Sequence, residues 1–190
     1  IEDLMKILPG PDFPTGALIM GQAGIRSAYE TGKGSIVMRS KAEIIENNNR
    51  SQIIISEIPY QVNKSQLLER VGELVREKTI EGIQDLRDES DRDGLRIVVE
   101  IKRDSDPNVI LNQLFRHTRF QTAFSVNLLA LNAGKPEQMG LKEVLSAFVA
   151  FREEVIYKRT RFHLNKARER AHILAGLMVA LTSIDEIISL

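Results

Sequence analysis

The segment from Leu141 to Thr182 constrains the fold most, because it contains no proline and a single glycine, Gly176. Such a run favours one long helix, which at about 1.5 Å per residue would extend for roughly 60 Å. A compact domain cannot cover a helix of that length, so we expect it to project as an arm. In its second part, apolar residues recur at alternating spacings of three and four, which is typical of a coiled coil. These residues are Leu164, Ala167, Ala171, Leu174, Met178 and Leu181.

Two further patterns belong to this C-terminal segment. Ser183 and Glu186 form the signature of a capping box, which predicts that a second helix begins after the long one. The first turns of the long helix carry apolar residues that we expect to be buried, namely Val144, Leu145, Phe148, Phe151 and Val155. Residues 141–190 are therefore predicted to be a long helix that begins a coiled coil.

Residues 1–140 alternate between strand and helix patterns, which predicts an α+β domain with a mixed sheet and packed helices. Period-two alternation over residues 35–45 predicts one half-buried strand, and Asn47–Asn49 predict a turn into a hairpin strand at 52–58. From residue 52 the order strand, helix, strand, strand, helix, strand is that of a split β-α-β domain. The remaining predicted elements are a helix over 64–78 capped by Asn63, strands over 80–86 and 95–103, a helix from Asp106–Pro107, a strand over 123–131 and a loop over 132–140.

Composition gives no general preference for a polyanion. Lys plus Arg is 26 and Asp plus Glu is 26, so any nucleic-acid surface must come from segregated charge. The chain has no cysteine, which removes disulfides and thiolate metal sites and fits a cytoplasmic location. No signal peptide or long uncharged apolar stretch is present, so no membrane partner is expected. Because the chain opens on Ile1 and stops in an apolar helical pattern, we expect a piece of a longer protein.

The stretch PGPDFPTGALIMG, residues 9–21, encloses four apolar residues in turn-forming sequence. Its prolines restrict the backbone, so no regular element is expected before Thr15. The apolar run at residues 17–20 has two interpretations, a buried strand or a wedge held out toward a partner. DNA-bending proteins pair such a wedge with cations that hold the phosphate backbone. Positive charge follows the run at Arg26, Lys33, Arg39 and Lys41.

Three other motifs have simpler interpretations. TGKGS, residues 31–35, lacks the spacing of a nucleotide-binding loop and predicts a helix-to-strand turn in which Gly32 closes a short helix over 25–29. In ESDRDG, residues 89–94, and at Glu100, carboxylates occur at the spacing of calcium ligands. A calcium-binding loop of this kind leads into a helix, whereas a strand pattern follows here, so a hairpin turn explains the motif better. The histidines show no paired spacing, so no metal site is predicted.

Five blocks of this sequence resemble the A subunits of the bacterial type IIA topoisomerases, DNA gyrase and topoisomerase IV. The blocks are GPDFPTGALIMG, AYETGKGSIVMRSKAEI, SEIPYQVNK, LRDESDRDGLRIVVEIKR and KARERAHILAGL. The resemblance covers essentially the whole chain, and PGPDFPT with EIPYQVNK favours the gyrase branch. The resemblance implies a tower domain over residues 1–140, followed over 141–190 by the start of the coiled-coil arm that leads to the exit gate.

The resemblance also implies a function. The intact enzyme would use ATP to pass one duplex through another and introduce negative supercoils, as an A2B2 complex of two A and two B subunits on double-stranded DNA. ATP and Mg²⁺ would be held by the B subunit, and this segment would hold no cofactor or metal. In the family an isoleucine intercalates into the bent DNA; the matching position is Ile19, with Leu18 as the alternative. Charge and proximity assign backbone contacts to Arg26, Lys33, Arg39 and Lys41.

The family's catalytic tyrosine follows an arginine, and no Arg-Tyr pair occurs in this sequence. No catalytic residue is therefore assigned, and the segment alone should neither cleave DNA nor hydrolyse ATP. A second hypothesis from a different class stays open. In it, the chain is a structural coiled-coil module whose α/β head binds only protein and has no affinity for DNA.

Overall fold

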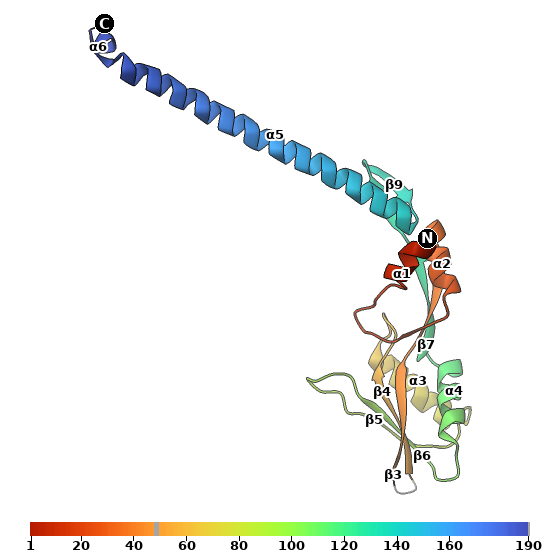
Figure 1. The fold of residues 1–190 in the computed structure, drawn as a ribbon. Coiled ribbons are helices and arrows are strands. Elements are labelled where there is room, and N and C mark those ends of the chain that lie inside the picture. The colour runs from red at the N-terminus through yellow and green to blue at the C-terminus, as the bar shows by residue number, and fades with distance from the viewer. Residues whose placement is uncertain (48–49, 190) are drawn as a thin grey trace. The chain divides into compact units, whose positions relative to one another are not determined.

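The computed structural model describes residues 1–47 and 50–189, in two units, Ile1–Lys142 and Glu143–Leu190. The first unit contains a four-stranded sheet, a three-stranded sheet, a separate two-stranded hairpin and packed helices, which confirms the predicted α+β class (Figure 1). Its elements are α1 (Glu2–Ile7), β1 (Leu18–Met20), α2 (Ala23–Thr31), β2 (Lys33–Arg39), β3 (Lys41–Asn47), β4 (Arg50–Glu57), α3 (Lys64–Arg76), β5 (Ile83–Asp88), β6 (Ile97–Ile101), α4 (Pro107–His117), β7 (Gln121–Asn127), β8 (Leu129–Asn132) and β9 (Lys135–Gln138).

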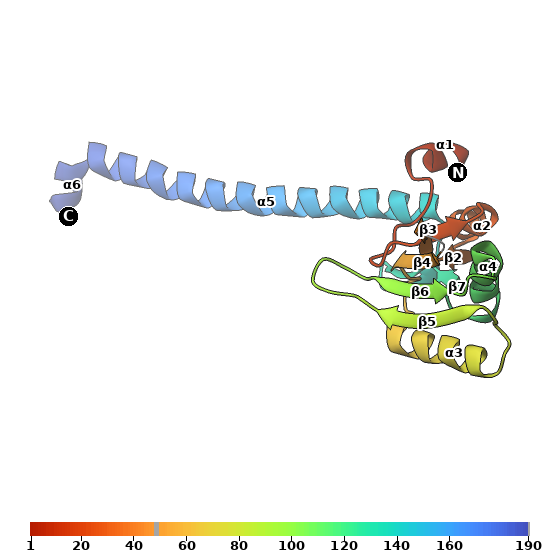
Figure 2. The same cartoon turned by 90° about the horizontal axis from the view of Figure 1, so that it is seen from below.

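The larger sheet has the strand order β3-β4-β6-β5, with antiparallel neighbours. Because β6 lies between β4 and β5 and runs opposite to both, β4, α3 and β5 form the split β-α-β unit that the sequence predicted. Helices α3 and α4 pack against this sheet, and Figure 2 shows α3 running along β5. Their contact with the sheet forms the main core, which includes Ile53, Ile55, Leu67, Val71, Leu74, Val99, Leu114 and Phe120.

Helices α3 and α4 begin where their capping residues predicted. The Asn63 side-chain oxygen accepts a hydrogen bond from the Gln66 amide at 3.2 Å, and Asp106 accepts one from the Asn108 amide at 2.7 Å. Pro107 occupies the first turn of α4, where a missing N–H costs nothing.

The smaller sheet has the order β1-β2-β7 and is covered on one face by α2. A second core cluster joins the helix to the sheet through Ile25, Tyr29, Ile36 and Met38. The helix approaches β2 very closely. A Cβ atom on Gly24 would overlap the Ser35 carbonyl, and one on Gly34 would overlap the backbone of α2, so only glycine permits this contact.

The single strand predicted over residues 35–45 is wrong in one respect, because it is broken at Ser40. Residues before Ser40 form β2 in the smaller sheet, and residues after it form β3 in the larger sheet. Ser40 is buried, and its amide donates to the Phe120 carbonyl at 2.8 Å instead of continuing either ladder. β7, the last strand of the predicted split domain, likewise pairs with β2 rather than with the larger sheet.

Three local predictions are corrected. Helix α1 lies before Thr15, because the prolines restrict the backbone only from residue 8 onward and leave the preceding residues free to form a helix. The strand predicted over 123–131 is divided between β7 and β8, and the predicted loop at 132–140 contains β9, which pairs with β8 in a hairpin. The hairpin turns at Ala133 and Gly134, both with positive φ, which sequence spacing alone did not reveal.

Other local predictions are confirmed. Gly32 closes α2 in the left-handed conformation at φ 76°, and β2 begins at the next residue. The predicted hairpin is present, since β3 and β4 pair antiparallel as far as Asn47 and Arg50. Asn48 and Asn49 of the predicted turn lie outside the described residues.

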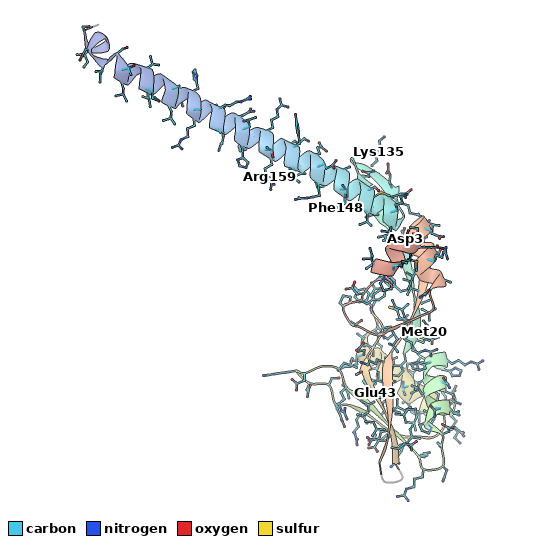
Figure 3. The ribbon with its side chains drawn as sticks, in the orientation of Figure 1. Asp3, Met20, Glu43, Lys135, Phe148 and Arg159 are labelled. Carbon is cyan, nitrogen blue, oxygen red and sulfur yellow. The ribbon has the colours of Figure 1, made fainter. Side chains whose placement is uncertain are left out.

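The predicted long helix is present as α5 (Leu141–Thr182), and α6 (Ile184–Ile188) follows it. Ser183 occupies the N-cap position of α6, although its side chain makes no capping hydrogen bond. The expected burial of the first turns of α5 is not seen within this chain: Phe148 and Phe151 are each 59% exposed, and Figure 3 shows Phe148 at the surface of the helix. An isolated helix has no second layer on which to bury these side chains.

Candidate nucleic-acid interface

One face of the smaller sheet is left uncovered, and we call it the open face. Side chains alternate along a strand, and the register pairs Leu18 with Arg39, Met20 with Val37, and Lys33 with Asn127. These residues therefore share the face opposite α2. The open face consists of Leu18 and Met20 from β1, Lys33, Ser35, Val37 and Arg39 from β2, and Gln121, Ala123, Ser125 and Asn127 from β7.

The chemistry of the open face suits a polyanion better than a protein core. Its central residues Ser35, Ala123 and Ser125 are small and exposed, so the backbone of the sheet is accessible. The face carries two cations and no carboxylate. Hydroxyl, amide and cationic groups are the side chains that most often contact DNA phosphates.

Two side-chain contacts hold Arg39 in place on this face. Its Nε donates to Gln121 Oε1 at 2.7 Å, and its guanidinium lies over the Phe115 ring, 4.6 Å from the ring centroid. These two contacts fix the side chain, while the neutral partners leave its positive charge unbalanced. An anion that approaches this end of the face therefore meets a pre-organised guanidinium.

Lys33 lies at the other end of β2 and is exposed. Its backbone is held firmly, because its carbonyl accepts hydrogen bonds from the Ser27 and Thr31 hydroxyls at 2.9 and 3.0 Å. Its ammonium group forms no ion pair with any residue that the structure describes. Lys33 is thus a free cation on a fixed strand, which fits the predicted contact with a phosphate.

The two apolar residues singled out by the sequence lie on opposite faces of β1. Leu18 is 48% exposed on the open face, and Met20, labelled in Figure 3, is 40% exposed beside it. Ile19 is half-buried on the other face, where it packs against the cluster that contains Ile25 and Met38. Of the two candidates, Leu18 therefore has the more exposed side chain, and Met20 accompanies it on the open face.

A strained turn sets the position of β1. Gly16 and Ala17 both have left-handed φ values, 70° and 74°, immediately before Leu18. The Glu57 carboxylate holds this turn by accepting a hydrogen bond from the Ala17 amide at 2.5 Å. Its other oxygen lies 3.7 Å from Lys41 Nζ, so the predicted contact residue Lys41 is partly neutralised within the chain.

Arg26 differs from the other predicted contact residues. It projects from α2, which covers the opposite face of the sheet, and it is bound by two carboxylates, Glu30 at 3.0 Å and Glu2 at 2.9 Å. The hydrogen bonds that Arg26 donates to these carboxylates, first to Glu30 and then to Glu2, raise the pKa of Arg26. The structure thus brings Lys33 and Arg39 together on the open face and does not bring Arg26 or Lys41 to it.

Sequence reasoning missed the contribution of β7. Gln121, Ser125 and Asn127 face the same side as Lys33 and Arg39, although they lie more than 80 residues away in the chain. One signal was present: in QTAFSVN, Phe124 and Val126 alternate with these small and polar residues. The alternation identifies a half-buried strand, but only the pairing shows which strand lies beside it.

The calcium-like motif forms the β5–β6 hairpin. Glu89 is bound to Arg96 at 3.0 Å and to Arg87 at 3.2 Å, and the Asp91 amide donates to the Gly94 carbonyl at 3.1 Å. Over the described residues, no group of three or more metal-ligating side chains is found. Among these residues, no helix combines the length and the hydrophobicity of a membrane span.

The whole sequence is similar to known proteins. A family model for the A subunit of DNA gyrase/topoisomerase IV matches residues 1–190. The chain is 59% identical over 191 residues to the DNA gyrase A subunit of Granulibacter bethesdensis, covering all of this chain and 20% of the relative. It is 57% identical to that of Clostridium acetobutylicum, covering 23% of the relative, and 59% identical to that of Rickettsia conorii, covering 99% of this chain and 21% of the relative.

The chain therefore spans between a fifth and a quarter of the length of these relatives. The match runs through the open face, the turn before β1 and the long helix α5, since it includes every residue of the sequence. On this evidence the chain belongs to the family of DNA gyrase and topoisomerase IV A subunits.

Proposed function

We propose that this chain is the part of a type II topoisomerase A subunit that holds duplex DNA on the open face. The observation that carries the proposal is the pairing of β2 with β7, which gathers Lys33, Arg39 and small polar side chains on one uncovered surface without a carboxylate. Membership of the family supports DNA as the polyanion. The cations would contact phosphates, and the small side chains would let the backbone approach the sheet closely.

The proposal places this chain in a larger machine. The intact enzyme would negatively supercoil DNA in the cytoplasm with ATP, as a complex of two A subunits and two B subunits. ATP and Mg²⁺ would be held by the B subunit. The relatives' names, which describe them as A subunits of DNA gyrase, and the match over the whole chain support this assignment.

Bending of the DNA would combine an apolar contact with the cationic ones. Leu18 is about half exposed, so burying the rest of it contributes on the order of 1 kcal/mol. Unstacking a base step costs a few kcal/mol. Leu18 alone does not offset that cost, so the contacts of Lys33 and Arg39 with the backbone must supply most of the energy. For the Ile19 side chain to insert between base pairs, it would first have to leave the core cluster that contains Ile25 and Met38.

Helix α5 would link this DNA-holding domain to the exit gate as one strand of a coiled coil. Its heptad positions are open within this chain, since Leu164 is 46% exposed, Leu174 51% and Met178 68%. Exposed apolar residues at this spacing favour a helical partner.

Catalysis of DNA cleavage would require another part of the enzyme. Tyr29 is 6% exposed, and burial, followed by the charge of Asp12, raises its pKa, which disfavours a phenolate nucleophile. The Tyr60 ring makes a tilted contact with Phe13 and an edge contact with Phe124. No tyrosine in the sequence directly follows an arginine. We therefore expect the isolated chain to produce neither relaxed plasmid nor a covalent DNA adduct.

The test is the binding of a 30-base-pair duplex, followed by fluorescence anisotropy over a range of salt concentrations. Lys33→Gln should lower the affinity and reduce the slope of log K against log salt by about 1, because one phosphate contact is lost. Lys102→Gln is the matched control, since Lys102 is also exposed and its side chain forms no ion pair among the described residues. Equal effects of the two variants, or no salt-dependent binding at all, would favour the protein-binding module instead.

A further inference from the structure

A cavity of about 480 Å³ lies in the first unit, away from the open face residues themselves. It is bounded by the N-terminal half of α3 and by the turn between α4 and β7. We call it the α3–α4 corner, lined by Asn63, Gln66, Leu67, Arg70, Arg116, His117, Thr118 and Arg119. Its volume lies within the range of about 300–1,000 Å³ typical of small-ligand sites.

The lining of the α3–α4 corner is strongly basic. Three arginines and one histidine contribute to it, and no carboxylate does. Arg70 is paired with Glu73 at 2.8 Å, but Arg116 and Arg119 form no ion pair with any residue that the structure describes. Two guanidinium groups therefore face one cavity with their charge unbalanced.

The floor of the cavity is rigid. Leu67 is 3% exposed and belongs to the main core. The Thr118 hydroxyl donates to the Leu114 carbonyl at 2.6 Å and accepts from the Phe120 amide at 3.2 Å. These bonds fix the backbone that carries Arg116 and Arg119. The start of α3, where Asn63 caps the helix, adds the positive end of a helix dipole.

The corner also continues the charge of the open face. Arg119 precedes Gln121 by two residues, so their Cα atoms are at most about 7 Å apart. Gln121 binds Arg39, and Arg39 lies over Phe115 of α4, the residue next to Arg116. Arg39 is thus in contact with Gln121 and Phe115, which belong to the segments that carry Arg119 and Arg116.

We propose that the α3–α4 corner binds a phosphate group, with Arg116 and Arg119 as its principal ligands. A guanidinium group can donate two parallel hydrogen bonds to two oxygens of one phosphate. A cluster of arginines without carboxylates is therefore well suited to that ligand. The phosphate belongs either to the DNA backbone or to a free phosphoryl anion. The first source rests on the proposed function, and the second is independent of it.

Two titrations of the 190-residue chain separate these sources. In the first, inorganic pyrophosphate is added while the amide resonances of residues 63–66 and 116–119 are followed by NMR. In the second, a 30-base-pair duplex is titrated by anisotropy at several salt concentrations. The variant is Arg116→Gln with Arg119→Gln. The matched control is Arg92→Gln with Arg103→Gln, which removes two exposed arginines elsewhere.

A DNA phosphate predicts that the corner variant loses duplex affinity about tenfold and that its salt slope falls by one to two, with a smaller change in the control. A free anion predicts that pyrophosphate shifts the corner amides in the native chain and the control but not in the corner variant, with duplex binding unchanged. Either result supports the site. If pyrophosphate shifts no corner amide and both variants bind duplex equally, the proposal is overturned, whatever Lys33→Gln shows for the open face.

Discussion

The carboxylate of Glu57 should control the position of β1, and its replacement tests how the apolar strand is held. Glu57 accepts the Ala17 amide at 2.5 Å and pairs with Lys41 at 3.7 Å. Ala17 has a φ of 74°, which an L-residue adopts at a cost of about 1 kcal/mol or more. Without the carboxylate, the Ala17 amide loses this hydrogen bond, and the turn should open locally more often.

The expected magnitude follows from the two contacts. A hydrogen bond to a charged acceptor contributes about 1.5–3 kcal/mol, and a pair as exposed as Lys41 and Glu57 contributes about 1 kcal/mol or less. Glu57→Ala should therefore cost about 2 kcal/mol locally. Glu57→Gln keeps a neutral acceptor and should cost about 1 kcal/mol, while Lys41→Gln removes only the ion pair and should cost the least.

The assay is hydrogen exchange of the Ala17 amide, which reports local opening. Since about 1.4 kcal/mol corresponds to a factor of ten, Glu57→Ala should accelerate exchange about 30-fold and Glu57→Gln about fivefold. Amides of the larger sheet serve as the internal control and should keep their rates. An unchanged Ala17 rate in Glu57→Ala would refute the idea that this carboxylate holds the turn. An equally large effect of Lys41→Gln would show that charge, rather than the hydrogen bond, is responsible.

Three further outcomes are expected. Gly34→Ala should destabilise the domain by about 3 kcal/mol or more in urea unfolding, because its Cβ would overlap the backbone of α2, whereas Gly176→Ala, with no atom in its way, should stabilise α5 by up to about 1 kcal/mol. Lys64, 2.7 Å away, followed by the Ser90 hydroxyl, lowers the pKa of Asp88 to about 2, so the ionised Asp88 should stabilise the fold fully above about pH 4 and lose this effect between pH 4 and 2. Because Asp88 is a third exposed, we expect it to contribute less than about 1 kcal/mol to the free energy of unfolding. Lys64→Gln should reduce the pH dependence of the free energy of unfolding over that window. Ile19→Ala should lower the melting temperature more than Leu18→Ala, while Leu18→Ala should reduce DNA bending measured by energy transfer more than Ile19→Ala; the reverse order in both assays would contradict the assigned faces.

The candidate interface could be predicted only in part. Sequence reasoning selected Ile19, with Leu18 as the alternative, together with Lys33 and Arg39, because an apolar run beside basic residues is a local pattern. It also selected Arg26, whose two carboxylate partners include Glu2, 24 residues away. A basic side chain attracts DNA phosphates only where no carboxylate of the folded chain neutralises its charge, and the folded structure decides which carboxylates lie beside it. The open face itself needed the register between β2 and β7, which no local pattern contains.

Elements with local causes could be predicted from the amino-acid sequence. The Asn63 and Asp106 caps, the closure of α2 by Gly32 and the length of α5 all depend on residues within a few positions of one another. The change of sheets at Ser40 and the outward orientation of Leu18 on β1 depend on contacts between distant segments. The physical reason is that helix hydrogen bonds join residues four apart, whereas strand pairing joins distant residues, and its register decides which face of each strand meets solvent.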